Sequence, residues 1–341
     1  MLRLPSFRYH APSTVQEAVA LLAESPATTM IVAGGTDVLP NMKRGQWKPK
    51  TLVGLRGIRE LAAIMPGPGG SRIIGASTTL TTIVNDELLH AAVPGLWQAA
   101  AQIATPHLRN MGTIGGNLCL DTRCTYYDQS EEWRQAIGYC MKKDGTTCWV
   151  ATSSKRCLAV SSTDTAPMLL ALGATVTLVS ASGSRDVAVE DLYNNDGMQF
   201  LTRRPDELLT SISLPNTRGW KSAYWKLRRR GSFDFPVGAA AVAIKLDGGI
   251  VESARIALGA VASRPLLSEK AAGVLVGRQL TDDVIAAAAD AAYDIAKPMD
   301  NTDFELVWRK KMVRSLVTSA LRETRGDDMR AKRQSIARQI L

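Results

Sequence analysis

The chain has 341 residues, of which 45% are hydrophobic, 21% charged and 6% aromatic. These are ordinary globular proportions, so they exclude an intrinsically disordered chain and a collagen-like fibre. The length predicts two or three folded units of roughly 100–200 residues each. No run approaches the roughly 20 apolar residues that span a bilayer, and the first ten residues, MLRLPSFRYH, lack the apolar stretch of a signal peptide. We therefore expect a cytoplasmic protein with no membrane span.

The formal net charge of +9 raises the question of a nucleic-acid partner. Most of this charge lies in residues 309–341, which carry ten basic and three acidic side chains and so account for +7. No aromatic residues are interleaved with them, as a platform for single-stranded nucleic acid requires. We expect a solvated helix and tail at a subunit contact, and no nucleic-acid binding.

The first fifty-five residues are predicted to form a βαβ-like unit. Ser13 and Gln16 have the spacing of a helix capping box, and Val15, Val19 and Leu22 recur on one helical face. Strands are expected at 29–33, 52–55 and 72–75, a turn at 65–71, and helices around 80–89 and 96–104.

Residues 118–162 have poor periodicity, and regular structure resumes after them. The patterns predict a helix at 165–172, strands at 174–180, 223–229, 239–246 and 254–261, a boundary at 215–217, and helices at 282–296 and 303–322. Strands followed by helices, without strict alternation, favour an α+β C-terminal domain.

Two glycine pairs each follow an apolar segment and precede short polar side chains. They lie in the segments Ala33-Gly34-Gly35-Thr36-Asp37 and Thr113-Ile114-Gly115-Gly116-Asn117. Without a Cβ, such pairs let backbone N–H groups approach a phosphate. Neither matches G-x-G-x-x-G or the P-loop, and one pair alone would be an ordinary tight turn. Two such glycine pairs favour a binding site for a nucleotide cofactor, and the pattern alone does not identify the cofactor.

Three segments resemble a known family: IVAGGTDVLPNMK, TPHLRNMGTIGGNL and DTAPMLLALGA. They are similar to the FAD-binding subunit of the molybdenum hydroxylases, the family of the xanthine and carbon monoxide dehydrogenase flavoproteins, from Phe7 to about Arg322. The resemblance implies an α+β fold. A two-part FAD-binding domain of the vanillyl-alcohol oxidase (PCMH) type is followed by a smaller C-terminal α+β domain, as in the carbon monoxide dehydrogenase flavoprotein. The implied parts are residues 1–56, residues 57–216 with an insertion at about 120–161, residues 217–325, and a basic tail at 326–341.

The resemblance also implies which residues bind FAD, and it places no catalytic residue on this chain. Asp164 matches an acidic residue that bonds the ribityl chain. Lys226 resembles the family's lysine near the flavin, the alternative being an exposed strand residue. The two implied pyrophosphate loops consist of Ile31, Val32, Ala33, Gly34, Gly35, Thr36, Asp37 and Val38, and of Thr113, Gly115, Gly116 and Asn117.

All five cysteines lie within 39 consecutive positions: Cys119, Cys124, Cys140, Cys148 and Cys157. In a cytosolic chain such clustering indicates metal or redox chemistry rather than disulfides. The last four follow C-x15-C-x7-C-x8-C, which matches neither the paired knuckles of zinc sites nor the close spacing of ferredoxins. No histidine lies among them, so the spacing leaves a four-thiolate site for either zinc or an iron–sulfur cluster.

The insertion at about 120–161 sets this chain apart from ordinary members of the family. With these cysteine separations it resembles the flavin subunits of the 4-hydroxybenzoyl-CoA reductases. That resemblance implies a [4Fe–4S] cluster on Cys124, Cys140, Cys148 and Cys157, with Cys119 as a non-ligating bystander.

The implied function is electron transfer within a molybdenum enzyme that reduces 4-hydroxybenzoyl-CoA to benzoyl-CoA and water. Electrons would pass from reduced ferredoxin to the [4Fe–4S] cluster and FAD. They would then reach [2Fe–2S] clusters on a small partner subunit and molybdopterin on a large one, in a dimer of heterotrimers.

Three other functions fit the sequence. The first is a related flavin subunit whose complex acts on another aromatic or N-heterocyclic substrate. The second is an NAD-linked dehydrogenase subunit, although a hydride donor needs no extra one-electron relay. The third is a zinc-stabilised interaction module, which would be colourless.

Overall fold

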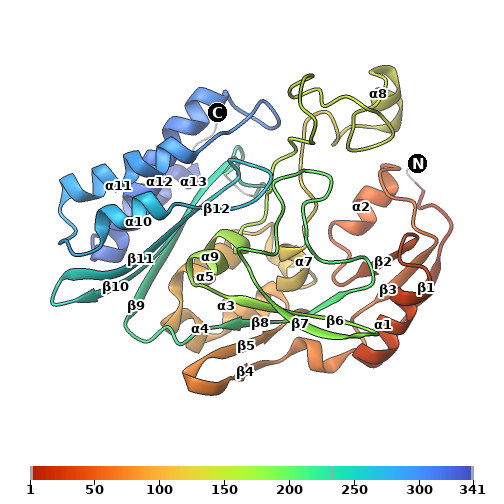
Figure 1. Ribbon diagram of the computed structural model, residues 1–341, viewed down its shortest axis with the longest axis horizontal. Helices are drawn as coiled ribbons and strands as arrows, with labels where there is room; N and C mark the ends of the chain where they lie inside the picture. Colours follow the sequence, from red (N-terminus) through yellow and green to blue (C-terminus); the bar gives the residue numbers. More distant parts are fainter. Residues whose placement is uncertain (1–2, 232, 339–341) are drawn as a thin grey trace.

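Three β-sheets organise the chain in the computed structural model, which describes residues 3–231 and 233–338 (Figure 1). The first sheet is parallel, with the order β1 (Arg8–His10), β3 (Thr51–Gly54), β2 (Thr29–Val32). The second is antiparallel, with the order β4 (Ile64–Pro66), β5 (Arg72–Gly75), β8 (Leu208–Leu214), β6 (Thr175–Ser180), β7 (Gly183–Ala188). The third is also antiparallel, with the order β12 (Leu266–Leu267), β11 (Ile250–Gly259), β10 (Gly238–Asp247), β9 (Trp220–Leu227).

Helix α1 (Val15–Glu24) packs Val15, Val19 and Leu22 into the core, as the periodicity predicts. Its cap is displaced by one residue from the predicted capping box. Thr14 Oγ1 accepts a hydrogen bond from Glu17 N–H at 3.2 Å, and Glu17 Oε2 accepts one from Ser13 N–H at 2.8 Å. The Ser13–Gln16 assignment is wrong because the carboxylate three residues after the cap belongs to Glu17.

A large core joins the second and third sheets. Its central element is α9 (Thr165–Ala171), in which every residue is buried. Five short helices contribute to this part of the chain: α3 (Leu80–Asn85), α4 (Glu87–Ala92), α5 (Pro94–Ala101), α6 (Pro106–Arg109) and α7 (Ile114–Leu118). Helices α9 and α5 both contact the third sheet, and α9 also contacts α7, which carries the second glycine pair.

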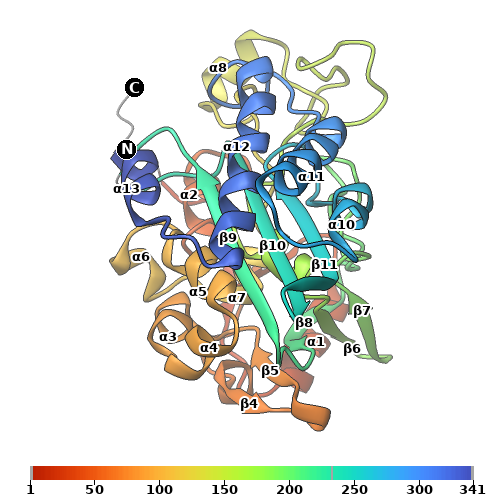
Figure 2. The same ribbon diagram turned by 90° about the vertical axis from the view of Figure 1, so that its left-hand side faces the viewer.

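The other face of the third sheet is covered by α10 (Glu269–Leu275), α11 (Asp282–Ile295) and α12 (Leu306–Arg325) (Figure 2). Within α12, Arg309 is fully buried and donates to the carbonyls of Val237, Met299 and Ala260 at 2.9, 2.7 and 2.8 Å. The predicted solvated helix is therefore wrong for α12, since its apolar stripe lies on the sheet and the Arg309 guanidinium is buried against three backbone carbonyls.

The basic C-terminal segment also packs against the body. Helix α13 (Arg330–Arg338) places the Arg333 guanidinium 4.2 Å from the Trp225 ring centroid. Arg333 also donates to Glu323, at 2.5 Å. A cation over an aromatic face and a carboxylate partner together favour docking over solvation.

The inserted segment lies above the rest of the molecule, around α8 (Glu131–Ala136) (Figure 1). Its two ends meet at a bridge between Arg123 and Val160. The Asn301 side chain donates to the Leu158 carbonyl at 2.6 Å, and Thr125 N–H donates to the Asn301 carbonyl at 3.0 Å. The segment is thus a closed loop that is tied to the C-terminal part of the chain. Among the residues described, no helix combines the length and apolar character required to cross a membrane.

Candidate functional site

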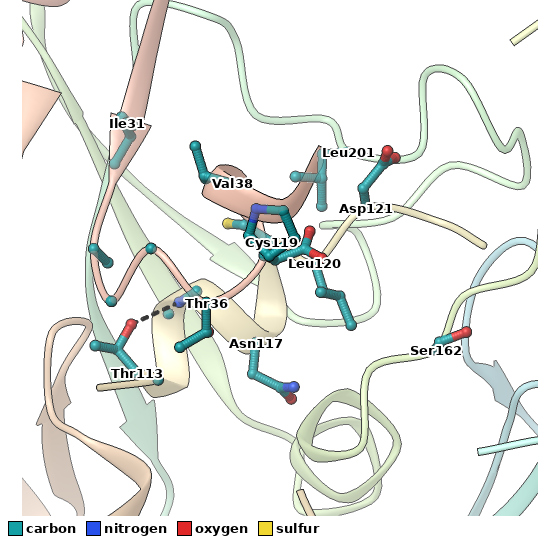
Figure 3. A pocket seen from close by; sticks show the side chains of 18 of the residues that line it. Ile31, Thr36, Val38, Thr113, Asn117, Cys119, Leu120, Asp121, Ser162 and Leu201 are labelled. Atoms are coloured by element: carbon teal, nitrogen blue, oxygen red, sulfur yellow. Dashed lines mark hydrogen bonds between the residues drawn. The ribbon is translucent and has the colours of Figure 1, made fainter. Parts of the chain in front are cut away.

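Both glycine turns line one cleft, with a volume of about 1110 Å³. Figure 3 shows side chains of β2, the first turn, the second turn and the start of the inserted segment around this space. Among the sequence-predicted residues, its lining includes Ile31, Ala33, Gly34, Gly35, Thr36, Asp37, Val38, Thr113, Gly115, Gly116, Asn117 and Asp164. Val32 instead packs in the core with Met42 and Leu52, and Lys226 lies behind Asp164.

The two turns touch through their backbones. A Cβ on Gly34 would overlap the Met111 carbonyl oxygen, and one on Gly115 would lie 2.7 Å from the Ala76 carbonyl oxygen. Gly35 has a φ of 71°, which favours glycine. Gly34 therefore lets the two turns approach each other, and Gly115 lets the second turn pack against Ala76, just after β5.

The backbone N–H groups of the two turns differ in their partners. In the second turn, Gly115 N–H donates to the Ala76 carbonyl at 2.9 Å and Gly116 N–H donates to Thr113 Oγ1 at 3.1 Å (Figure 3). For residues 34–37 of the first turn, no acceptor for the N–H groups occurs within the described parts of the chain. Successive N–H donors of this kind suit an anionic phosphate.

Asp164 is the buried carboxylate of the cleft, and two donor side chains, Lys226 and Tyr224, converge on it. Both of its oxygens lie 3.0 Å from Lys226 Nζ, and Oδ1 accepts from the Tyr224 hydroxyl at 2.7 Å. Burial raises the pKa of Asp164, against the opposing effects of Lys226 and Tyr224, and burial lowers the pKa of Lys226. Only 3% of Lys226 is exposed, so the alternative of an exposed strand residue is wrong. Lys226 acts on the cleft through Asp164.

The inserted segment also contributes to the cleft wall, which the sequence reasoning missed. Asp121, Arg123, Tyr127 and Lys142 all line it. Arg123 pairs with Asp37 of the first glycine turn and lies 3.3 Å from Asp128. Nothing in an irregular, charged loop signals such contacts before its fold is known, because they depend on tertiary pairing.

Four of the five cysteines surround a second, small cavity. Cys124, Cys140, Cys148 and Cys157 are all buried, all free of disulfides, and all line this space. Burial raises the pKa of the Cys124 thiol to about 12 and that of Cys157 to about 11, and the neighbouring sulfurs contribute to both increases. Cys119 lines the large cleft instead. Four buried sulfurs this close together become thiolates only when a positively charged group offsets them.

The four sulfurs enclose a space rather than converge on a point. Over the residues that can be described, no three His, Cys, Asp or Glu side chains are arranged to hold a metal ion. The cavity has a volume of about 10 Å³, which is room for about one water molecule. The inserted segment thus brings the four cysteines together, but their sulfurs have to move further apart to bind an iron–sulfur cluster.

Comparisons with known proteins cover nearly the whole chain. The models described as "FAD binding domain in molybdopterin dehydrogenase" and "CO dehydrogenase flavoprotein C-terminal domain" match residues 5–217 and 222–324. The chain is 31% identical to the carbon monoxide dehydrogenase medium chain of Afipia carboxidovorans, over 94% of this chain and 97% of that one. It is 29% identical to the aldehyde oxidoreductase FAD-binding subunit of Escherichia coli, over 93% and 99%.

A solved structure supports the same conclusion about the fold. Reconstituted CO dehydrogenase from Oligotropha carboxidovorans matches with a TM-score of 0.78 and 31% identity, over 95% of this chain and 99% of that one. The fold expected from the sequence, an FAD-binding part followed by a C-terminal part like that of the carbon monoxide dehydrogenase flavoprotein, is confirmed.

Replacing Gly34 by alanine tests the contact between the two turns. The new Cβ overlaps the Met111 carbonyl, so we expect a loss of about 1–3 kcal/mol in the free energy of unfolding and at least a tenfold weaker affinity for FAD. Thermal unfolding and flavin titration measure the two effects. Gly273→Ala is the control, because no heavy atom lies within 4 Å of a Cβ at this position of α10. Normal flavin affinity in Gly34→Ala would contradict the contact.

Replacing Lys226 by methionine tests the buried pair. Removing one partner leaves Asp164 buried without its cation, so we expect a loss of about 3–5 kcal/mol near neutral pH by denaturant unfolding. Burial raises the pKa of Asp164, so the folded variant binds a proton there more tightly than the unfolded chain does. The loss in the free energy of unfolding should therefore be larger at pH 8 than at pH 5. Lys221→Met, at an exposed position of the same strand, should have little effect. A loss of stability in Lys226→Met that does not change with pH would contradict the role of Lys226 as the counter-ion of Asp164.

Proposed function

Because the chain belongs to the FAD-binding medium subunits of the molybdenum hydroxylase family, we propose that it transfers electrons between two redox groups. FAD occupies the large cleft, and a [4Fe–4S] cluster is bound by the four cysteines of the inserted segment. The observation that carries the proposal is the position of the cysteine cavity directly beside the cleft, since Tyr127 and Lys142 line both.

The cleft fits the chemistry of FAD. The N–H donors of residues 34–37 suit the pyrophosphate. Thr113 and Asn117 of the second turn offer polar side chains for the pyrophosphate, and Asp164 offers its carboxylate for the ribityl chain. Bound FAD exchanges electrons one or two at a time, so it can connect one-electron carriers with a two-electron reaction. In this proposal Lys226 and Tyr224 hold Asp164 in the orientation that such a contact needs.

The cysteine cavity fits the donor chemistry of a cluster. Its four sulfurs are accompanied mainly by aromatic and apolar neighbours, with no carboxylate or imidazole in the lining. All-thiolate sites of this kind select zinc or iron–sulfur groups. The choice of the cluster over a single zinc ion rests on the resemblance of the insertion to that of the 4-hydroxybenzoyl-CoA reductases, and binding it requires the four cysteines to move apart from their positions around the small cavity. When bound, the cluster supplies or accepts one electron at a time.

The substrate follows from the resemblance of the insertion to that of the 4-hydroxybenzoyl-CoA reductases. The reaction consumes two electrons and two protons and converts 4-hydroxybenzoyl-CoA into benzoyl-CoA and water. Reducing a phenol ring requires a strong reductant, and [4Fe–4S] potentials reach roughly −700 mV. The chemistry on the substrate belongs to molybdopterin on a large partner subunit, which receives electrons through [2Fe–2S] clusters on a small one. In this proposal the complex is a dimer of heterotrimers.

Reduced ferredoxin is the proposed electron donor. Next to the cysteines in sequence, the charged side chains that are exposed or half-buried include Lys143, Lys155 and Arg156 against Asp144, whereas α8 of the same segment carries Glu131 and Glu132. Trp149 lines the cavity while 38% of it is exposed. A small acidic carrier protein is attracted to such basic side chains. An NAD-linked donor is the weaker alternative, because hydride transfer to FAD leaves the cysteine loop without a role.

The cluster assignment is tested on the purified chain. We expect about four iron atoms per flavin and a brown colour, and Cys140→Ser should lose the cluster signal in EPR and visible spectra while keeping its FAD. Cys119→Ser is the matched control, since Cys119 lines the cleft and not the cavity. Stoichiometric zinc without iron, or an unchanged EPR spectrum in Cys140→Ser, would overturn the assignment.

The substrate and donor are tested on the full complex. We expect reduced ferredoxin to drive benzoyl-CoA formation from 4-hydroxybenzoyl-CoA, and NADH not to bleach the flavin. Chromatography of the CoA thioesters and stopped-flow absorbance measure these outcomes. Turnover of an N-heterocycle but not of the thioester, or rapid bleaching by NADH, would establish one of the alternative functions instead.

A further inference from the structure

Lys142 is a buried cation between the two sites. It lies on the cysteine loop, two residues after Cys140, and its side chain is only 5% exposed. It lines both the large cleft and the cysteine cavity, a position that it shares with Tyr127. A buried ammonium is costly unless it is paired and hydrogen-bonded, so its position requires an explanation.

Three oxygens hold the Lys142 ammonium in place. Its Nζ donates to Asp121 Oδ1 at 2.6 Å, to Thr122 Oγ1 at 2.5 Å and to the Gly197 carbonyl at 2.7 Å. The Tyr127 ring centroid lies 4.8 Å away and that of Phe200 lies 5.7 Å away. With all three protons donated and aromatic faces around it, the charge has a fixed position.

These partners belong to the walls of the two sites. Asp121 and Phe200 line the cleft. Gly197 packs against Cys157, because its N–H donates to the Cys157 carbonyl at 2.9 Å and a Cβ on Gly197 would lie 2.8 Å from Cys157 Sγ. One fixed cation therefore acts on the cysteine cavity and on the cleft.

We propose that Lys142 is a positioning residue for electron transfer, whose fixed positive charge raises the reduction potentials of both redox groups together. Each group gains negative charge when it accepts an electron, and a nearby cation in a poorly solvated wall stabilises that charge. When one electron passes from the cluster to the flavin, the cluster is oxidised and the flavin reduced by one unit. The Lys142 charge assists reduction at both ends, so the difference between the two potentials is largely preserved. The inference rests on the proposed function, since it assumes a redox group in each space.

Lys142→Gln removes the charge while keeping an amide donor. In the holoprotein, we expect reduction of both groups to become at least tenfold less favourable. This corresponds to about 59 mV for the one-electron cluster and about 30 mV for two-electron reduction of the flavin. Redox titration followed by EPR and by visible absorbance measures the two potentials separately. Lys142→Arg should restore both to within threefold of the original equilibrium.

Lys143→Gln is the matched control. It removes the same charge from the adjacent residue, which pairs with Asp144 and lines neither space, and it should leave both potentials unchanged. If Lys142→Gln does not fold, Asp121→Asn gives the opposite test, because removing the counter-charge should raise both potentials. In a protein that holds both iron and flavin, unchanged potentials in Lys142→Gln, a shift at only one group, or an equal shift in Lys143→Gln would overturn the inference.

Failure of the proposed function gives a different result. If the purified chain holds zinc and no iron, the cluster assignment is lost, but the flavin potential still responds to Lys142 because this residue lines the cleft. If iron and flavin are both present and neither potential moves, the proposed function stands and the role of Lys142 does not.

Discussion

The site depends on one close contact, that between the backbone of Gly34 and the carbonyl of Met111. The contact joins the turn after β2 to the turn before α7, and both turns line the cleft. The two turns could not approach so closely if residue 34 carried a side chain. Because the second turn is bonded to Ala76 and Thr78 at the end of β5, this contact also fixes the first sheet relative to the second.

The inserted segment is built onto the same framework. Arg123, at the base of the loop, pairs with Asp37 in the first turn, and the neighbouring Cys124 N–H donates to Asp128 at 3.2 Å. Asp128 in turn lies 3.3 Å from Arg123. The position of a cysteine ligand is therefore coupled to the position of the turn proposed to hold the pyrophosphate. An insertion of this size could have formed a separate flap, and these pairs explain why it forms part of the cleft wall instead.

The sequence predicted those features that depend on local patterns. The strand at 72–75 and the helix at 165–172 were found because apolar residues recur at the spacing of a strand or a buried helix. Strand β7 was missed because its residues are mostly exposed and polar. The glycine turns and the cysteine set were visible from composition and spacing. Arg123 and Lys142 were not, since their importance comes from partners that are distant in sequence, Asp37, Asp121 and Gly197.

Buried or half-buried ion pairs lie where the walls face the proposed redox groups. Asp164 with Lys226, Asp121 with Lys142, and Asp37 with Arg123 each place opposite charges at or beside the cleft. Burying a pair costs desolvation energy that well-packed apolar residues would avoid, so stability alone does not explain three of them. Such pairs have a functional role beside a group that changes its charge during each electron transfer. Fixed, mutually oriented charges stabilise the added electron without first having to reorganise, whereas an apolar wall offers no such response.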